Sequence, residues 1–166
     1  MKTTLLRYLC AFALLCITFS CSNDDDAPFI PQGSTNPPVD TPSEVSITDE
    51  IFTLVNAHRL SNGLAALEKS TTADILAAEH SRYMIGQGRI SHDNRDTKFA
   101  TLRENENATR FGENVAAGQT SAQSVMTAWL NSDGHRENIE GDYTHIGIAA
   151  IKDQNGSYYY TQIFYR

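Results

Sequence analysis

Three segments of the chain carry apolar residues at the three- and four-residue spacing of a helix with one buried face. Each segment is preceded by a capping signal. The pairs are Ser46 with Asp49, Thr71 with Asp74, and Thr120 with Gln123. The first helix is predicted to stop at Asn62-Gly63 and the third at Asp133-Gly134. At the latter stop, Gly134 is expected to take the left-handed conformation that reverses the chain.

Two strands are predicted at the C-terminus, over residues 146–152 and 158–165, joined by a turn at Asn155-Gly156. Their apolar residues occupy both alternating faces, for example Ile146 and Ile148 against Ala149 and Ile151. A strand that is buried on two faces needs a layer on each side. The sequence therefore predicts an α+β fold, a three-layer α-β-α sandwich with a mainly antiparallel central sheet. A further short strand is predicted over residues 112–118.

The first twenty residues have the pattern of a secretory signal peptide. Lys2 and Arg7 precede the apolar run 8–19, whose twelve residues are too few to span a bilayer. Small residues then lead into Cys21, which resembles a bacterial lipobox. We therefore expect residues 1–20 to be removed and Cys21 to carry the lipid that anchors the protein to a membrane. The alternative is a plain signal peptide that is cleaved nearby.

Residues 21–44 are predicted to be an extended tether. All five prolines of the protein fall here, among polar residues that cannot form a core. The cluster Asp24-Asp25-Asp26 resembles the acidic export tag of surface lipoproteins in some Gram-negative bacteria, and the alternative is a soluble linker. One folded domain is expected from residue 45 to residue 166.

Charge and cysteine content exclude several classes of function. The chain has 13 Lys+Arg against 20 Asp+Glu, a net charge of −7, which argues against a nucleic-acid partner. The three cysteines, Cys10, Cys16 and Cys21, all lie in or beside the leader. The domain therefore has no disulfide framework, no thiolate metal site and no cysteine nucleophile.

Candidate chemistry is concentrated in three short stretches, each of which is a weak signal alone. His92 follows the second helix, Glu113 stands at the start of the predicted third strand, and His135 follows the third helix. Residues on loops that rigid elements hold in place are frequent sites of function. The remaining histidines, His58, His80 and His145, fit helix and strand faces and are interpreted as structural.

These stretches belong to a longer ordered series of motifs. In order they are Val55-Asn56-Ala57-His58-Arg59, Ala78-Glu79-His80-Ser81, Ser91-His92, Gly112-Glu113-Asn114-Val115-Ala116, Trp129-Leu130-Asn131-Ser132, Gly134-His135-Arg136-Glu137-Asn138-Ile139, Ile146-Gly147-Ile148 and Tyr160-Thr161-Gln162-Ile163-Phe164. Over about residues 47–166 the series resembles a bacterial CAP (SCP) domain. This is the superfamily of cysteine-rich secretory proteins, antigen 5 and plant pathogenesis-related proteins.

The resemblance implies a three-layer sandwich with a cavity lined by two histidines and two glutamates. By motif, His92 and His135 match the histidines and Glu113 matches the first glutamate, while Ser132 stands at the position of the second. Asn114, Ser132, Arg136 and Asn138 are expected to support this cavity.

A weak, exchangeable divalent-metal site follows from these residue types. Two neutral imidazoles can bind Zn²⁺ or a similar ion, but zinc sites usually have three or four protein ligands. Glu113 is expected either to bind the metal directly or to accept a hydrogen bond from metal-bound water.

Three functions are compatible with these residues. The first is a lipid-anchored module that binds a small lipid, peptide or glycan, or a partner. The second is a metal-dependent, protease-like hydrolase using His92, His135 and Glu113. The third is a structural or adhesive surface protein with a vestigial cavity. Binding is favoured over catalysis, and the expected location is the bacterial envelope, at the outer membrane and with possible surface exposure.

Overall fold

A computed structural model describes residues 45–166 of the chain. The predicted signal peptide, Cys21 and the tether lie outside the described residues. The elements, in chain order, are α1 (Ile47–Ser61), β1 (Glu68–Lys69), α2 (Thr71–Gln87), α3 (Arg95–Glu106), β2 (Phe111–Ala117), α4 (Ala122–Leu130), α5 (Asp133–Ile139), β3 (His145–Lys152) and β4 (Tyr158–Tyr165).

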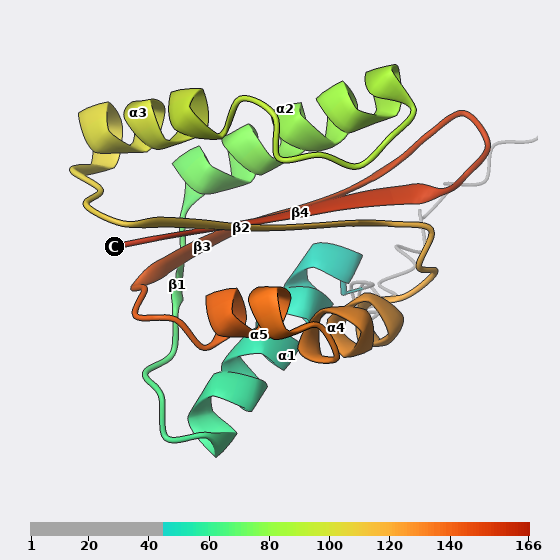
Figure 1. The fold of residues 1–166 in the computed structure, drawn as a ribbon. Coiled ribbons are helices and arrows are strands. Elements are labelled where there is room, and N and C mark those ends of the chain that lie inside the picture. Colours follow the sequence, from blue (N-terminus) through green and yellow to red (C-terminus); the bar gives the residue numbers. More distant parts are fainter. Residues whose placement is uncertain (1–44) are drawn as a thin grey trace, which may run out of the picture. The chain divides into compact units, whose positions relative to one another are not determined.

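The elements form the predicted three layers (Figure 1). Helices α2 and α3 cover one face of the sheet, and α1, α4 and α5 cover the other. The strand order is β1-β3-β4-β2. Strand β1 pairs with β3 in parallel, and the other two pairings are antiparallel, so the sheet is mixed and mainly antiparallel. Among residues 45–166 no helix is both long and apolar enough to cross a bilayer.

Two hydrophobic cores lie on the two faces of the sheet, as the alternation in the C-terminal strands predicts. Ile146 and Phe164 contribute to the core beneath α1 and α4, which also contains Trp129. Ala149 and Ile163 contribute to the core beneath α2 and α3. The prediction that both strands are buried on two faces is therefore confirmed.

Strand β2 forms one edge of the sheet, and side chains from three helices cover that edge. Carbonyl groups at alternate positions of β2 accept hydrogen bonds from these side chains at 3.1–3.3 Å. The donors are Arg95 to Phe111, Asn138 to Glu113, and Trp129 to Val115. Covering an edge in this way opposes the addition of a strand from another chain.

Several boundaries differ from the prediction. The helix expected to end at Asp133-Gly134 ends at Leu130, and α5 begins at Asp133. Gly134 therefore lies inside α5 and is not among the residues with positive φ, so the predicted left-handed turn is wrong. A new helix can begin at Asp133 because an acidic residue in the first turn interacts favourably with the positive end of the helix dipole.

Besides α5, two further elements were not predicted, α3 and the short strand β1. Helix α3 is mostly polar, and only Leu102 and Lys98 are buried in it, so its apolar periodicity is weak. The caps of two helices are also shifted by one residue. Ser70 caps α2, and Ser121 with Ser124 forms the capping box of α4.

Candidate functional site

The carboxylate of Glu113 lies at the centre of a buried cluster between β2 and the helices α2 and α3. Its side chain is only 1% exposed. His92 Nδ1 lies 2.8 Å from Oε1, Lys98 Nζ lies 2.5 Å from Oε2, and His80 Nε2 lies 3.8 Å from Oε1. The contact to Lys98 is a short ion pair between two buried side chains.

Opposing effects set the charge states in this cluster. Burial acts to raise the pKa of Glu113, but the hydrogen bond from His92 and the ammonium group of Lys98 outweigh it and hold this pKa below its ordinary value. The pKa of Lys98 is also lowered, because burial outweighs the attraction of Glu113. Burial likewise lowers the pKa of His80, against the attraction of Glu113. Glu113 is therefore an ionised carboxylate with a buried cationic partner.

The loop that carries His92 is fixed by three side chains. It starts after Gly88, which takes a left-handed conformation at the end of α2. His80 Nε2 donates to the carbonyl of Ser91 at 2.7 Å. The carboxylate of Asp93 accepts a hydrogen bond from the Tyr83 hydroxyl at 2.9 Å. The backbone carbonyl of Asp93 accepts a second one from Lys98 Nζ at 3.0 Å.

The ring of His92 is consequently presented in one orientation. Glu113 is ionised and accepts a hydrogen bond, so Nδ1 of His92 carries the proton that is donated to it. The lone pair of His92 then resides on Nε2, and the side chain is 51% exposed. A carboxylate that orients an imidazole in this way is the usual second partner of a metal-binding histidine.

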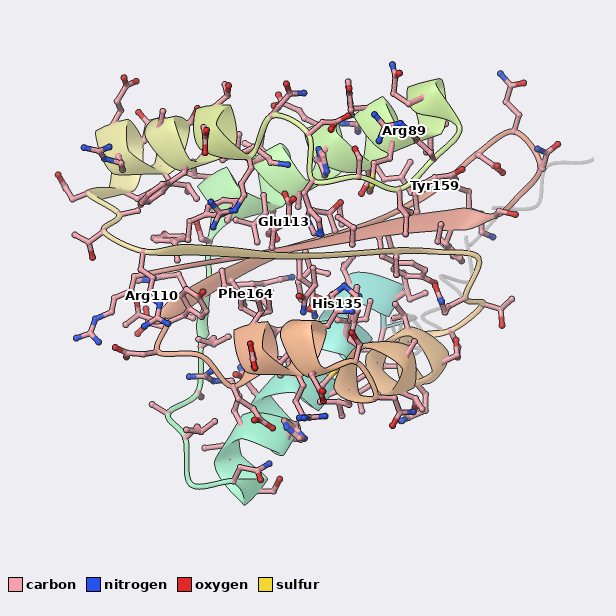
Figure 2. All side chains as sticks on the ribbon, in the orientation of Figure 1. Arg89, Arg110, Glu113, His135, Tyr159 and Phe164 are labelled. Atoms are coloured by element: carbon pink, nitrogen blue, oxygen red, sulfur yellow. The ribbon has the colours of Figure 1, made fainter. Side chains whose placement is uncertain are left out.

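His135 lies in α5, on the opposite side of β2 from Glu113 (Figure 2). Asn114 Nδ2 donates to the His135 carbonyl at 3.0 Å, and Asn138 Nδ2 donates to Asn114 Oδ1 at 2.9 Å. Burial lowers the pKa of the half-buried ring of His135 below its ordinary value. Burial therefore favours the neutral imidazole of His135.

The other expected supporting residues have more local roles. Arg136 donates to the carbonyl of Leu130 at 3.0 Å and pairs with Asp133, which joins α5 to the end of α4. Ser132 is the N-cap residue of α5 but makes no side-chain capping bond.

The donor set of this site is limited to the two imidazoles. Both oxygens of Glu113 are already engaged by His92 and Lys98. Within residues 45–166, no three His, Cys, Asp or Glu residues are arranged to hold a metal ion. Glu113 therefore orients His92, and its two engaged oxygens fit poorly as ligands of a three-ligand site.

Sequence reasoning missed two members of the cluster, His80 and Lys98. His80 was interpreted as structural, and its bond to Ser91 agrees with that role, but it also faces Glu113. Its position on the buried face of α2 was visible in the sequence. Lys98 carried no signal, because it lies in the polar segment that was not recognised as a helix. His58 pairs with Glu140 at 2.9 Å, and His145 stacks on Tyr165 at 4.8 Å, so both are outside the site.

A family model described as the CAP, cysteine-rich secretory protein family matches residues 52–164. The chain belongs to this family. The match contains the whole candidate site, from the loop of His92 to α5. The CAP resemblance in the ordered motifs is therefore confirmed.

Two curated relatives come from Bacillus subtilis. Uncharacterized protein YkwD is 32% identical over 123 residues, which cover 71% of this chain and 48% of the relative. Uncharacterized membrane protein YlbC is 33% identical over 132 residues, which cover 76% of this chain and 35% of the relative. The chain thus spans about half or less of the length of the curated relatives it matches.

Solved structures show the same fold. An extracellular protein of Bacillus anthracis that contains an SCP domain matches with a TM-score of 0.63 and 29% identity, covering 72% of this chain and 40% of that chain. An outer surface protein of Borrelia burgdorferi matches with a TM-score of 0.66 and 20% identity, covering 72% of this chain and 92% of that chain. At that identity the second similarity concerns the fold alone.

Proposed function

We propose that this CAP-domain protein is a binding module of the bacterial envelope, and that His92 and His135 bind a divalent metal ion weakly and exchangeably. The observation that carries the proposal is the 2.8 Å bond between His92 Nδ1 and Glu113 Oε1. It leaves the lone pair of Nε2 free on a half-exposed ring, which is the form of histidine that binds metals.

In this proposal His92 and His135 are the two metal ligands, and the charges around them set how tightly a cation binds. Burial lowers the pKa of His135, which favours its neutral, metal-binding form. Zn²⁺ bound by two imidazoles would keep open positions that a small lipid, peptide or glycan can occupy through an oxygen atom. The positive charge of Lys98 cancels that of Glu113, so the cluster adds little net attraction for a cation. The small number of protein ligands and the cancelled charge both favour weak metal binding.

Binding is a better account of this site than hydrolysis. A metal-dependent hydrolase needs a group that takes a proton from the attacking water. Glu113 is the nearest candidate, but its oxygens are occupied by His92 and Lys98 and its pKa is held below the ordinary value. A carboxylate in this state is a poor general base, so its role is to orient His92.

The proposed location is the bacterial envelope, with Cys21 as a lipid anchor. Support comes from the apolar run that ends at Cys21 and from two relatives, one named as a membrane protein and one as an extracellular protein. A Cys21→Ala variant expressed in a bacterial host is expected to move from the detergent phase to the aqueous phase. Detergent partitioning equal to that of the wild type would refute the anchor.

Zinc titration by calorimetry tests the metal proposal. The purified protein is compared with the double variant His92→Ala/His135→Ala, and with His145→Ala as a control that removes a histidine outside the site. We expect saturable binding in the wild type and in the control, and no binding in the double variant. Circular dichroism verifies that all three proteins are folded.

Two results would overturn the proposal. Equal affinity in the double variant would assign any zinc binding to other groups. No binding in the wild-type protein would leave a site without a metal, and a structural role would then be the better account.

A further inference from the structure

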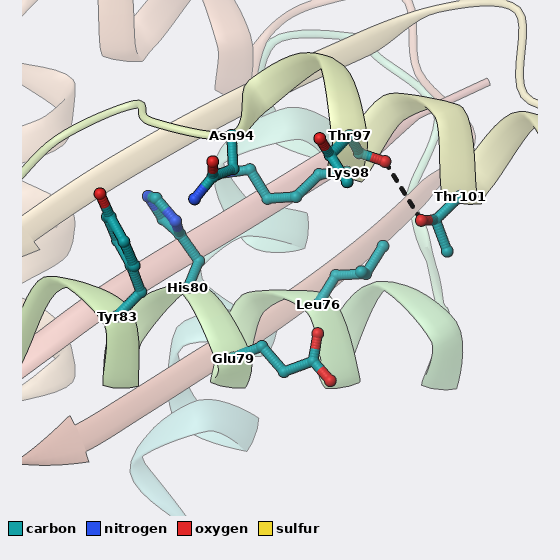
Figure 3. A pocket seen from close by; sticks show the side chains of 8 residues that line it. All are labelled: Leu76, Glu79, His80, Tyr83, Asn94, Thr97, Lys98 and Thr101. Carbon is teal, nitrogen blue, oxygen red and sulfur yellow. Dashed lines mark hydrogen bonds between the residues drawn. The ribbon is translucent and has the colours of Figure 1, made fainter.

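Lys98 is a buried cation in the first turn of α3, and lysine is seldom buried in a protein without a partner. Only 7% of its side chain is exposed. It lines a cavity of about 280 Å³ between α2 and α3, together with His80 and Tyr83 (Figure 3). A buried ion pair adds little stability over apolar side chains of similar size, so stability alone is a weak reason for a lysine here.

The ammonium group of Lys98 contacts both groups that hold the ring of His92 in place. Nζ lies 2.5 Å from Glu113 Oε2, and the other oxygen of this carboxylate lies 2.8 Å from His92 Nδ1. Nζ also donates to the carbonyl of Asp93, the residue after His92, at 3.0 Å. The same ammonium is therefore bound to the carboxylate that orients the ring and to the backbone of the loop that carries it.

The charge on Glu113 determines which nitrogen of His92 carries the proton. An ionised carboxylate only accepts hydrogen bonds, so Nδ1 must donate, and Nε2 keeps its lone pair. A neutral carboxyl group can donate instead, in which case Nδ1 accepts and Nε2 carries the proton. Burial favours the neutral carboxyl, and the side chain of Glu113 is 1% exposed. The accepting form therefore depends on a cation beside it.

We infer that Lys98 is a positioning residue of the proposed metal site, which selects the tautomer of His92 with a free Nε2 lone pair by holding Glu113 as an acceptor. Lys98 acts through Glu113, since it makes no hydrogen bond to either imidazole within residues 45–166. The consequence for metal binding rests on the proposed function. The tautomer itself is a property of the metal-free protein.

NMR of the ¹⁵N-labelled histidine rings in the metal-free protein at pH 7.5 tests this inference, because bare and protonated ring nitrogens have well-separated resonances. The signals of His92 are assigned by their loss in His92→Ala. In the wild type we expect a protonated Nδ1 and a bare Nε2.

Two variants of Lys98 separate its charge from its hydrogen bond. Lys98→Gln keeps a donor for the Asp93 carbonyl but removes the charge, and we expect the Nε2 resonance of His92 to move to the protonated position. The proton that replaces the ammonium charge can sit on the carboxyl or on the ring, and both arrangements protonate Nε2. Lys98→Arg keeps the charge and should keep the wild-type tautomer.

A double variant keeps the test decisive if Lys98→Gln does not fold. Lys98→Met/Glu113→Gln removes both charges together, and its neutral amide can donate or accept, so both tautomers of His92 should be populated. Lys69→Gln removes an exposed lysine in β1 and should give the wild-type spectrum. A wild-type tautomer in Lys98→Gln or in the double variant would overturn the inference, as would a Lys98→Arg spectrum equal to that of Lys98→Gln.

Zinc calorimetry distinguishes a failure of this inference from a failure of the metal proposal. Where the wild type binds zinc, Lys98→Gln should bind it about 10–100-fold more weakly, as is usual when a group that orients a metal ligand is lost. Lys98→Arg should bind as the wild type does. Unchanged affinity in Lys98→Gln would overturn the positioning role. Absence of zinc binding in the wild type would refute the metal proposal, and the tautomer measurement would still decide the role of Lys98.

Discussion

Glu113 and Asn114 are neighbours in β2, yet each holds a different histidine segment on a different face of the sheet. Glu113 accepts a hydrogen bond from His92 Nδ1 at 2.8 Å, and Asn114 donates to the carbonyl of His135 at 3.0 Å. Successive side chains of a strand point to opposite faces, so one dipeptide ties both segments to the same edge strand. The relative placement of the two imidazoles therefore depends on the geometry of two adjacent residues.

The ion pair between Lys98 and Glu113 should be sensitive to the loss of either partner. Lys98→Met leaves a buried carboxylate without its ammonium, and we expect it to lower the free energy of unfolding by about 3–5 kcal/mol. Adding Glu113→Gln should recover part of this loss. Urea denaturation measures both. Lys69→Met, which removes an exposed ion pair with Asp49, should cost far less. A similarly small cost for Lys98→Met would contradict a buried pair.

The stability of the protein should decrease as the pH falls below about 6.5. The pKa of His80 is lowered from 6.5 because burial of its ring outweighs the attraction of Glu113. Below pH 6.5 the unfolded chain takes up a proton that the folded protein does not, so the free energy of unfolding falls. Glu113 adds little to this slope above about pH 5.5, because the unfolded pKa is 4.5 and the folded pKa lies lower still.

His80→Gln tests the origin of that slope, since its amide can still donate to Ser91. Urea denaturation at pH 5.5 and 7.5 should show a smaller difference for the variant than for the wild type. His135 has a pKa shifted in the same direction, so a residual slope is expected. An identical slope in both proteins would assign the pH dependence elsewhere.

Asn114→Ala should loosen α5. Asn114 is fully buried and bonds to His135, Asn138 and Gln162, so its loss leaves polar groups without partners, at a cost of about 1–3 kcal/mol. Hydrogen exchange should rise over residues 133–139. Thr161→Val removes a buried hydrogen bond on the other face, to Ser81, and should destabilise the protein without this local effect. Exchange unchanged in α5 would show that Asn114 does not hold it.

Gly147→Ala should be strongly unfavourable, since a Cβ at this position would lie 2.1 Å from the carbonyl carbon of Ala73 in α2. Backbone on both sides must move, and we expect a loss of about 1–3 kcal/mol or more in thermal or urea unfolding. Gly86→Ala is the matched control, because its Cβ meets nothing within 4 Å and it lies in a helix. That variant should gain about 0.4–1 kcal/mol. A neutral Gly147→Ala would contradict the close approach of α2 to β3.

The layered architecture was largely determined by local sequence. Helices α1, α2 and α4 follow from apolar spacing and capping residues, and the two-faced strands β3 and β4 demand a layer on each side. Helix α3 escaped because a mostly polar helix has little apolar periodicity, and α5 because a seven-residue helix after a short break gives no signal distinct from a turn. The left-handed conformation predicted for Gly134 was wrong because Gly134 lies inside α5.

The sequence by itself determined the residue types of the site and, through its ordered motifs, the family to which they belong. Only the tertiary structure placed them: it brings His92 into contact with Glu113 on one side of β2 and sets His135 in α5 on the other side. It also placed Lys98 and His80 beside Glu113, and it showed that one oxygen of Glu113 contacts His92 and the other contacts Lys98. Buried ion pairs between distant segments depend on packing across elements, which no local pattern in the chain records.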